Sequence, residues 1–563
     1  MDTPRLELHP AVAQRLSRLA PDQRAAATAP PGPVLCVAPA GSGKTTTLIA
    51  RIAWLVASGA DPATVLAIAF NRRAAEEMVE RLDAALAPLG VAHGAVRVKT
   101  FHALGMEILR SAGRSVEPLL ARDSVLRAVR SDASAAELRA LDTAISRLKL
   151  DLMVDVDAVA ADPAAGPLAR TFVAYERALR ERRGLDFDDL VAQAIRALEA
   201  DPVLLGCWRA AAVHMLVDEA QDLDRSQLRL ALLLAAPRNQ VFLVGDDDQS
   251  IYGWRLADVR RVLGLAAELP GLRRVDLEVN YRCPAAVLER AVRLVEVNRE
   301  RFVKRIRAGP AAVGRLVLAP DSGEDTERIR QVLQSWTGLE GTQAILARTN
   351  RELLPAAAVL LDLGLPFRAA RIVWPLESPC VDDLLALAAA TDPGLPLLVR
   401  LGLVRGGAGE VAAAGDEGSV FDQATVPDSG SPPLSPAEVA TALIAWAAPF
   451  HDLETFAGAV HEHRERLHEL RRDDAPRTLA TAHSTKGLEF DHVAVLADGF
   501  PAQRSVAESA EPERALEEER RLAYVAWTRA RRSLTLVYDP AAPSPFLGEA
   551  FSDEELAPSG TVG

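Results

Sequence analysis

Cysteine is scarce in this sequence, and the few cysteines stand far apart. Four are present among 563 residues, at positions 36, 207, 283 and 380, and no two form a CxxC pair. This distribution argues against a disulfide framework and against a zinc ribbon. Long apolar runs are also lacking, because no stretch reaches the roughly 18 apolar residues that span a bilayer. The N-terminal segment MDTPRLELHPAVAQRLSRL has no apolar core before a cleavage site, so we expect a cytoplasmic protein.

An excess of positive charge is lacking too. The 64 Lys and Arg residues against 77 Asp and Glu residues give a formal net charge of −13. That charge argues against a uniformly basic surface that coats a polyanion, although a local basic groove stays compatible with it. With 49% hydrophobic and 25% charged residues, the composition is that of a folded globular chain. At about 150 residues per domain, the length suggests roughly three to four domains.

Short apolar runs that end at polar or glycine-rich turns recur along the chain, and a predicted helix follows each of them. This is the pattern of buried parallel strands in an α/β sheet. The runs fall into two sets, 34–38, 65–70, 213–218 and 241–245, and then 344–347, 478–483, 493–496 and 534–538. We therefore predict an α/β fold with two parallel-sheet cores.

Helical periodicity without strong strand runs interrupts both predicted cores. The second interruption contains a loop, 408–436, that is rich in Gly, Ser, Pro and acidic residues and is expected to be mobile. The first predicted core comprises 1–104 and 190–279, with a helical insertion at 105–189. The second comprises 280–385 and 476–550, with an insertion at 386–475. Residues 551–563 are predicted to form an untethered tail.

The segment VLCVAPAGSGKTTTL, residues 34–48, predicts a phosphate-binding loop between a buried strand and a helix. Gly41 and Gly43 let successive backbone N–H groups turn inward, where they form a nest for phosphate oxygens with the helix N-terminus. Lys44 would reach the β- and γ-phosphates, and the Thr45 hydroxyl would complete a Mg²⁺ shell. Ala38 stands at the first glycine of the GxxxxGK[ST] pattern. The residues expected at the nucleotide are Ala40, Gly41, Ser42, Gly43, Lys44, Thr45 and Thr46.

Two acids follow a second buried strand in MLVDEAQD. Asp218 at the strand end would hold Mg²⁺ through water, and Glu219 would orient and deprotonate an attacking water. Taken alone, the pair could equally be capping acids at a strand end. A phosphate loop by itself does not separate a small-molecule kinase from a GTPase or a motor.

The wider set of motifs resembles the superfamily 1 DNA helicases of the UvrD/Rep/PcrA type. The motifs run in family order from Gln23 to beyond Arg532, as PDQR, APAGSGKT, AIAFNRRAAEEM, VKTFHALG, LDFDDL, VDEAQD, VGDDDQSIYGWRLA, LEVNYRCP, AILARTN, TAHSTKGLEFDHV and EEERRLAYVAWTRA. The resemblance implies two RecA-like cores, 1A and 2A, with ATP and Mg²⁺ between them and association with the nucleoid. It assigns nucleotide contacts to Gln23 (adenine), Tyr281 (stacking on the base), Gln249, Arg282 and Arg529 (γ-phosphate) and Glu489 (ribose). In VAWTRARR, Arg529 follows an apolar helical stretch and is expected to project into a gap, whereas Arg531 and Arg532 are expected at a solvated helix end.

Aromatic and basic residues in these motifs predict a track for single-stranded DNA, because bases stack on aromatic rings while cations follow the phosphates. The resemblance and the residue types assign DNA contacts to Phe70, Arg73, His102, Tyr252, Trp254, Arg255, His483 and Lys486. The alternative is that Phe70 and Tyr252 are core aromatics and that Trp254 packs on a domain surface. RFVKRIR, residues 301–307, predicts a basic helical patch that either meets phosphates or is a solvated face.

Three departures from the family pattern stand out. Asn71, Arg72 and Arg73 replace the usual Thr-Asn-Lys, Cys283 replaces a Ser, and Leu256 stands where Gly is usual. The insertion at 386–475 is considerably shorter than the 2B subdomain of the family, which contacts duplex and regulates unwinding. We therefore hypothesise intact translocation on single strands, with strand separation by the monomer weak or dependent on a partner or self-association.

The leading interpretation is an ATP-dependent motor that moves 3′→5′ on single-stranded DNA and unwinds duplex at single-strand/double-strand junctions, in DNA repair or replication. The direction comes from the resemblance. The alternative is a nucleotide-gated DNA-binding clamp or regulatory subunit that hydrolyses ATP poorly. A small-molecule phosphotransferase would leave the second core and the YGWR segment unexplained.

Overall fold

The computed structural model describes residues 8–151, 156–162, 165–320, 325–369, 374–411 and 436–556. The chain divides into two compact units. Unit 1 comprises Met1–Tyr281 and Asn298–Pro310, and unit 2 comprises Arg282–Val297 and Ala311–Gly563. The predicted boundary at 279/280 missed the return of 298–310 to the first unit, because this short segment carries no strand run of its own.

Unit 1 is built on a parallel six-stranded sheet in the order β3-β2-β4-β5-β1-β6. Its strands are β1 (Val34–Val37), β2 (Val65–Ile68), β3 (Arg97–Lys99), β4 (His214–Val217), β5 (Val241–Gly245) and β6 (Arg273–Asp276). The four strands predicted from apolar runs, β1, β2, β4 and β5, are confirmed. They lie together in the middle of the sheet, where both faces of a strand are covered and apolar residues are continuous.

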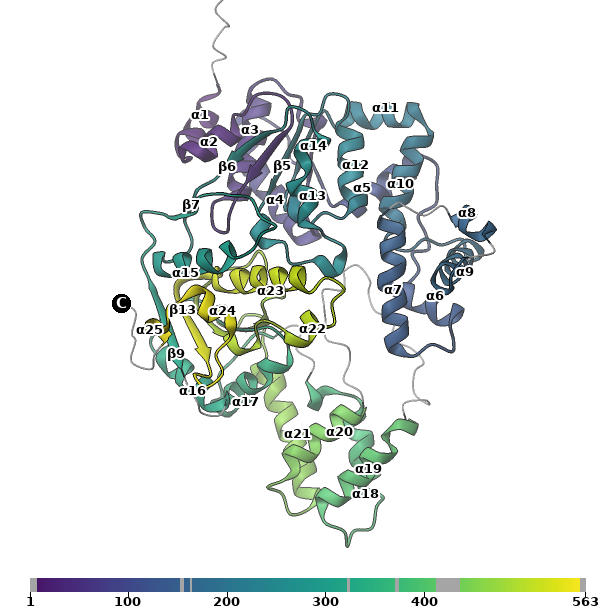
Figure 1. Ribbon diagram of the computed structural model, residues 1–563, viewed down its shortest axis with the longest axis vertical. Coiled ribbons are helices and arrows are strands. Elements are labelled where there is room, and N and C mark those ends of the chain that lie inside the picture. Colours follow the sequence, from purple (N-terminus) through teal and green to yellow (C-terminus); the bar gives the residue numbers. More distant parts are fainter. Residues whose placement is uncertain are drawn as a thin grey trace, which may run out of the picture. The chain divides into compact units, whose positions relative to one another are not determined.

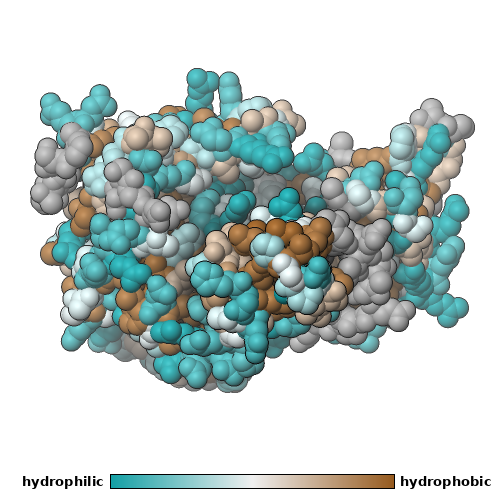
Figure 2. All heavy atoms as spheres, turned by 90° about the horizontal axis from the view of Figure 1, so that it is seen from below, coloured by the Kyte–Doolittle hydropathy of each residue, from teal (hydrophilic) through white to brown (hydrophobic). Residues whose placement is uncertain are grey.

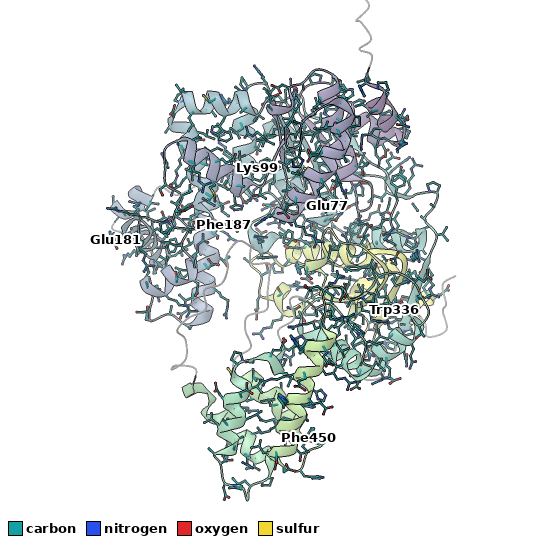
Figure 3. The ribbon with its side chains drawn as sticks, turned by 180° about the vertical axis from the view of Figure 1, so that it is seen from behind. Glu77, Lys99, Glu181, Phe187, Trp336 and Phe450 are labelled. Atoms are coloured by element: carbon teal, nitrogen blue, oxygen red, sulfur yellow. The ribbon has the colours of Figure 1, made fainter. Side chains whose placement is uncertain are left out.

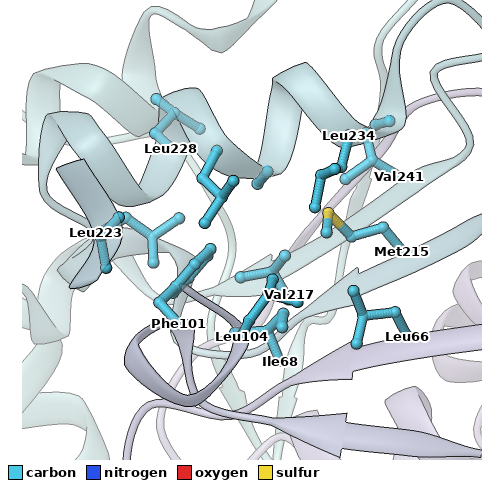
Figure 4. Close-up of a cluster of buried hydrophobic side chains, with 14 of the residues drawn as sticks. Leu66, Ile68, Phe101, Leu104, Met215, Val217, Leu223, Leu228, Leu234 and Val241 are labelled. Atoms are coloured by element: carbon cyan, nitrogen blue, oxygen red, sulfur yellow. The ribbon is translucent and has the colours of Figure 1, made fainter. Parts of the chain in front are cut away.

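Side chains of each central strand alternate between two apolar cores. In β2, Leu66 and Ile68 belong to one core, and Val65 and Ala67 belong to the other. This follows from the two-residue period of a strand, which points successive side chains to opposite faces. Figure 4 shows the first core, where Leu66 and Ile68 lie beneath Leu228 and Leu234 of α12.

Helices cover both faces of this sheet (Figure 1). One core contains side chains from α1 (Pro10–Ser17), α2 (Pro21–Ala27), α3 (Lys44–Ala57) and α4 (Arg72–Leu86). The other contains side chains from α5 (Phe101–Ser111), α10 (Asp189–Ala200), α11 (Pro202–Ala211), α12 (Arg225–Ala235), α13 (Val259–Leu263) and α14 (Leu265–Glu268). The sheet and its two helical layers are those of a doubly wound α/β domain.

A separate group of helices in unit 1 has a core of its own. It consists of α6 (Arg122–Val129), α7 (Ala135–Leu150), α8 (Val156–Ala161) and α9 (Pro167–Glu181), and its core includes Leu126, Ile145 and Phe172. The predicted start of this insertion at residue 105 falls inside α5. Because Leu104 and Ile108 of that helix both belong to the core of the sheet, the separate helical group begins after α5.

Unit 2 is built on a parallel five-stranded sheet in the order β11-β10-β12-β13-β9. Its strands are β9 (Arg315–Pro320), β10 (Gln343–Ala347), β11 (Arg477–Thr481), β12 (Phe490–Leu496) and β13 (Ala530–Tyr538). The helices of this domain are α15 (Ala285–Glu296), α16 (Asp325–Ser335), α17 (Leu354–Asp362), α22 (Gln503–Ala507), α23 (Pro512–Trp527), α24 (Pro545–Ala550) and α25 (Asp553–Leu556). The prediction of two parallel α/β cores is therefore confirmed.

A second group of helices, in unit 2, also packs around its own core. It consists of α18 (Cys380–Ala389), α19 (Leu397–Val411), α20 (Pro436–Ala447) and α21 (Leu453–Leu470), which lie together in Figure 1. Leu384, Leu401, Leu443 and Phe456 are among its core residues. Most of the loop predicted at 408–436 lies outside the described residues.

The predicted untethered tail at 551–563 is wrong for its first residues. Phe551 is buried, Glu555 forms an ion pair with Arg290 of α15, and the Leu556 carbonyl accepts a hydrogen bond from Tyr538. Polar composition suggested a free end, but a buried aromatic and a salt bridge anchor it. Residues 557–563 lie outside the described part of the chain.

No helix in the described ranges is long and apolar enough to cross a membrane. The face of the molecule drawn in Figure 2 carries hydrophilic side chains over most of its area, with apolar patches between them.

Candidate functional site

The turn after β1 has the backbone of a phosphate-binding loop. Gly41 and Gly43 adopt positive φ angles of 66° and 83°, and α3 begins at Lys44. A side chain at Gly43 would be strained, and its Cβ would lie 2.7 Å from the amide nitrogen of Gln23. The Ser42 hydroxyl is buried and has no hydrogen-bond partner among the described residues. This cradle of backbone N–H groups at a helix N-terminus fits phosphate oxygens.

Gln23 and Tyr281 are both attached to this loop. The Gln23 side chain donates a hydrogen bond of 2.8 Å to the Ser42 carbonyl, and the backbone N–H of Tyr281 donates one of 2.9 Å to the Gly41 carbonyl. Asn280 supports the same loop by donating to the Ala40 carbonyl at 2.7 Å. The Tyr281 side chain is 51% exposed, so its ring is accessible for stacking. The structure therefore brings Gln23 and Tyr281 to the phosphate loop.

Asp218 and Glu219 follow β4 directly, as predicted. Glu219 has a φ of 51°, in the left-handed region that residues with a side chain rarely occupy. Its backbone N–H donates to the Asp218 carboxylate at 2.9 Å. Strained backbone of this kind persists where the surrounding structure enforces it, and it is concentrated at functional sites.

Gln221 is a residue of this site that sequence reasoning missed. Its Oε1 accepts the backbone N–H of Asp246 at 2.9 Å, and its Nε2 donates to the Glu219 carboxylate at 2.6 Å. Because a backbone N–H can only donate, the orientation of the amide is determined by this contact. Gly245 makes room for the bridge, since a Cβ there would lie 2.4 Å from Gln221 Oε1. The position of Gln221 inside VDEAQD, two residues after Glu219, was the available signal.

Gln249 lies in a 3₁₀ turn after β5, Asp247–Gln249. Its Nε2 is 2.5 Å from a carboxylate oxygen of Asp246. Gln249 and Glu219 thus connect to the same residue, Asp246, one directly and one through Gln221.

The basic segment 301–307 is not helical, which corrects the prediction. It has no regular secondary structure up to the short strand β8 (Arg307–Ala308), which pairs with β7 (Val279–Asn280). Lys304 is buried, 8% exposed, while Arg305 and Arg307 are exposed. Arg301 and Lys304 form ion pairs with buried aspartates of unit 1. The segment is therefore not a basic helix, and it is not solvated along its whole length.

In unit 2, two residues assigned to the nucleotide contact each other. Arg282 Nε donates to the Glu489 carboxylate at 2.7 Å, and Arg531 lies 3.5 Å from the same carboxylate. Glu489 therefore lies between two guanidinium groups. Cys283, which replaces the usual Ser, is buried and 3.5 Å from the Thr528 carbonyl.

Arg529 does not project from the end of α23, contrary to expectation. Its side chain is 1% exposed, and its guanidinium donates to the carbonyls of Val525 and Leu488 at 2.8 and 3.1 Å. The apolar run before it suggested an exposed helix end. The Val525 carbonyl lies in the last turn of α23, where carbonyl groups lack backbone partners within the helix and attract cations. The Leu488 carbonyl, in the loop before β12, accepts from the same guanidinium.

The aromatic residues expected on the DNA track form a group in unit 1. Phe70 and Tyr252 stack with ring centroids 5.3 Å apart, and Trp254 meets Tyr252 edge-on at 6.0 Å. The Arg255 guanidinium lies 5.4 Å from the Trp254 ring. Tyr252 is buried, as the core-aromatic alternative predicts, whereas Trp254 is 42% exposed. Leu256, at the usual glycine position, has a φ of 63°, which explains why glycine suits that position.

His102, at the start of α5, stacks on Phe187 with ring centroids 3.9 Å apart. Phe187, labelled in Figure 3, lies in LDFDDL. It is 40% exposed, and sequence reasoning did not single it out. Burial, assisted by the charge of Arg255, lowers the pKa of His102 to about 4, so its ring is neutral near pH 7. Arg73 is exposed on α4, whose N-terminus Asn71 caps by accepting from Ala74 N–H.

His483 and Lys486 follow β11 in unit 2, in and after the 3₁₀ turn His483–Thr485. Burial, assisted by the charges of Arg348 and Lys486, lowers the pKa of His483 to about 3. The ring is therefore neutral at physiological pH and able to accept a hydrogen bond. The two residues lie together in unit 2, while the other residues assigned to DNA lie in unit 1.

The phosphate loop, the acids after β4 and the two parallel sheets define a P-loop nucleotide-binding protein with two RecA-like cores. The sequence matches the UvrD/REP helicase N-terminal domain over residues 19–270 and the UvrD-like helicase C-terminal domain over residues 463–540. It is 30% identical to the ATP-dependent DNA helicase UvrD1 of Mycobacterium tuberculosis, over 92% of this chain and 82% of that protein. It is 34% identical to the ATP-dependent DNA helicase PcrA of Staphylococcus aureus, over 51% of this chain and 41% of that protein. The chain belongs to the UvrD/Rep helicase family.

Proposed function

We propose that this protein is an ATP-dependent DNA helicase that moves 3′→5′ along single-stranded DNA and separates duplex ahead of it. Membership of the UvrD/Rep family supports the activity, and the hydrogen-bonded Glu219 beside an intact phosphate loop supports hydrolysis. The direction is that of the family. The observation that carries the proposal is the carboxylate of Glu219, oriented by Gln221 at 2.6 Å as a general base requires.

ATP is the proposed fuel, with Mg²⁺ as its cation. The loop from Ala40 to Thr46 supplies the backbone nest, Lys44 supplies a cation for the β- and γ-phosphates, and Gln23 lies where it would contact the base. Thr45 and Asp218 would hold the Mg²⁺, which prefers one or two protein oxygens together with phosphate oxygens and water. When bound, Mg²⁺ neutralises charge on the phosphates.

The proposed division of labour in hydrolysis follows from these positions. Glu219 accepts the proton of the attacking water, and Gln249 contacts the γ-phosphate from unit 1. Arg282, Arg529 and Glu489 of unit 2 would complete the site at the γ-phosphate and the ribose. Arg529 would first have to exchange its hydrogen bonds to Val525 and Leu488, so its engagement would require a rearrangement of the end of α23.

The DNA track is proposed to run over the aromatic group of unit 1. Trp254 is accessible and has Arg255 beside it, which suits base stacking next to a phosphate. Tyr252, which stacks on Phe70 and contacts the Trp254 ring, would hold that ring in position. Arg73, His102, His483 and Lys486 remain proposed contacts.

The test is a DNA-stimulated ATPase assay combined with strand displacement on 3′-tailed and 5′-tailed duplexes. Wild type should hydrolyse ATP faster with single-stranded DNA and should displace the strand of the 3′-tailed substrate. Lys44→Ala and Glu219→Gln should abolish both activities. Normal turnover in either variant, or unwinding of the 5′-tailed substrate alone, would contradict the proposal.

A protein partner or self-association is proposed for processive unwinding, because the insertion at 386–475 is short for a 2B subdomain. Translocation should then be intact at dilute protein, while unwinding of a long duplex should increase with protein concentration or with a partner. Robust unwinding of a long tailed duplex by dilute monomer would contradict this. The alternative function, a nucleotide-gated DNA clamp, predicts ATP-dependent DNA binding with little hydrolysis in the same assay.

A further inference from the structure

Five charged side chains form a buried cluster in unit 1, next to the turn that carries Gln249. Three consecutive aspartates, Asp246, Asp247 and Asp248, are almost completely buried. The Lys304 ammonium group lies 2.9 Å from Asp246, 2.5 Å from Asp247 and 2.9 Å from Asp248. Arg301 adds two hydrogen bonds to Asp248, at 3.0 and 2.9 Å. None of these residues has so far been given a role in hydrolysis.

Hydrogen bonds connect the cluster to Gln249 and Glu219, two residues proposed to act on ATP. One Asp246 carboxylate oxygen contacts Lys304, and the other accepts from Gln249 Nε2 at 2.5 Å. The backbone N–H of Asp246 donates to Gln221, which in turn donates to Glu219. Asp246 therefore contacts Gln249 directly and Glu219 through Gln221. Lys304 is the cation that pairs with the Asp246 carboxylate.

The three buried carboxylates depend on the Lys304 ammonium group more strongly than the carboxylate of a surface ion pair depends on its partner. A buried carboxylate without a cation is strongly unfavourable, and three adjacent ones repel one another. Burial alone would lower the pKa of Lys304, but the three carboxylates raise it well above its usual value. Burial, together with the charges of Asp248 and Asp246, raises the pKa of Asp247 to about 6, while the charge of Lys304 opposes this rise.

The lysine comes from a distinctive part of the chain. Lys304 lies in Asn298–Pro310, the unit 1 segment that follows α15 of unit 2 and leads back into unit 2 at Ala311. A second contact ties the same segment to the sheet, because Arg274 of β6 donates to the Val303 carbonyl at 2.8 Å and pairs with Asp276. None of the contacts described for Arg274 involves the cluster aspartates Asp246, Asp247 and Asp248. Arg274 therefore offers a matched control.

We propose that Lys304, with Arg301, is a positioning residue for ATP hydrolysis: it holds Asp246 where Asp246 orients Gln249 and, through Gln221, Glu219. The inference rests on the proposed function. It predicts a change in turnover with little change in ATP binding, because the cluster contacts no part of the phosphate loop in the described structure. A residue that only stabilises the fold would change neither parameter once stability is restored.

The experiment compares the full-length wild type with three variants by DNA-stimulated kcat, by KM for ATP and by melting temperature. Lys304→Met removes the cation, and Lys304→Met/Asp247→Asn removes the cation together with one carboxylate to restore the charge balance. Arg274→Met removes the hydrogen bond to the Val303 carbonyl and the ion pair with Asp276, and leaves the cluster of Asp246, Asp247 and Asp248 unchanged. We expect kcat to fall at least 10-fold in both Lys304 variants with KM within twofold of wild type. The double variant should recover most of the melting temperature, and Arg274→Met should keep kcat within twofold.

A folded Lys304 variant with wild-type kcat would overturn the inference, and so would recovery of kcat along with melting temperature in the double variant. An equal loss in Arg274→Met would overturn it too, because tethering of the segment would then suffice. If Lys304→Met does not fold, the double variant decides by the same criteria. Absence of DNA-stimulated hydrolysis in wild type would instead overturn the proposed function, and this inference with it.

Discussion

The side-chain amide nitrogen of Gln221 lies 2.6 Å from a carboxylate oxygen of Glu219. The other end of the same amide accepts the backbone N–H of Asp246, so Gln221 has a single orientation and holds Glu219 in one rotamer. A general base contributes to the rate only when it lies within reach of the proton that it accepts. This contact therefore bears directly on turnover.

Replacing Gln221 by methionine should lower DNA-stimulated kcat by about 10- to 100-fold, a part of the contribution of a positioned base. Methionine fills a similar volume but neither donates to Glu219 nor accepts from Asp246. The KM for ATP should change little, because Gln221 has no contact with the phosphate loop in the described structure. Steady-state kinetics would measure both, with the exposed Gln334→Met as control. A Gln221→Met enzyme with wild-type kcat would contradict the positioning role.

Replacing Trp254 by alanine should weaken single-stranded DNA binding by about 5- to 150-fold, which corresponds to ~1–3 kcal/mol for one stacked base. The melting temperature should change little, since the ring is 42% exposed. Tyr252→Leu should instead lower the melting temperature, because Tyr252 is buried and stacked on Phe70. Fluorescence anisotropy with an oligothymidine and thermal melting would separate the two. Equal DNA affinity in wild type and Trp254→Ala would exclude stacking there.

Replacing Glu489 by glutamine should lower the free energy of unfolding by less than about 1 kcal/mol, because exposed ion pairs contribute little to stability. Glu489 is 42% exposed, and its partner Arg282 is 17% exposed. If Glu489 contacts the ribose, the KM for ATP should increase in the same variant. Chemical denaturation and ATPase kinetics would measure the two effects. The control is Glu508→Gln, because Glu508 directly follows α22 and forms an exposed ion pair with Arg504. An unchanged KM would limit Glu489 to holding Arg282.

The pH dependence of stability should reveal the burial of His102. Burial lowers its pKa to about 4 in the folded protein, against about 6.5 in an unfolded chain. Between these values the unfolded chain binds a proton that the folded protein does not bind. The free energy of unfolding should therefore fall as the pH decreases from 6.5 to 4, by up to about 1 kcal/mol per pH unit from this residue. His102→Asn should show a shallower pH dependence than wild type in denaturant titrations, and identical slopes would contradict the assignment.

The fold was predictable where the signal is local. β1, β2, β4 and β5 are buried on both faces, so each is a continuous apolar run that can be recognised without knowing its neighbours. β3 and β6 were missed because they are the edge strands of the sheet, and their sequences RVK and RRVD carry charge in place of an apolar run. β9, at an edge of the second sheet, was missed although its sequence RLVLAP contains an apolar run, whereas β11 at the other edge was predicted.

The residues of the candidate site also fall into two groups, those in local motifs and those whose partners are distant in the chain. Residues 38–46, Asp218 and Glu219 are contiguous motifs at strand ends, and their places relative to the strands follow from the order of the chain. Lys304 was misjudged because its partners lie 57 and 58 positions away in the chain, where no local pattern indicates them. Arg529 was misjudged because its guanidinium donates to Val525 at the end of its own helix and to Leu488, a residue distant in the chain.

The sequence by itself determined the class of this protein, because the strand runs, the phosphate loop and the ordered helicase motifs are local patterns that depend on short-range backbone and burial preferences. Only the tertiary structure decided which polar side chains support one another. Gln221 and Lys304 meet Asp246 from positions that are 25 and 58 residues away from it in the sequence. A buried charge must find its partner wherever folding brings one, and that choice depends on the packing of the whole unit.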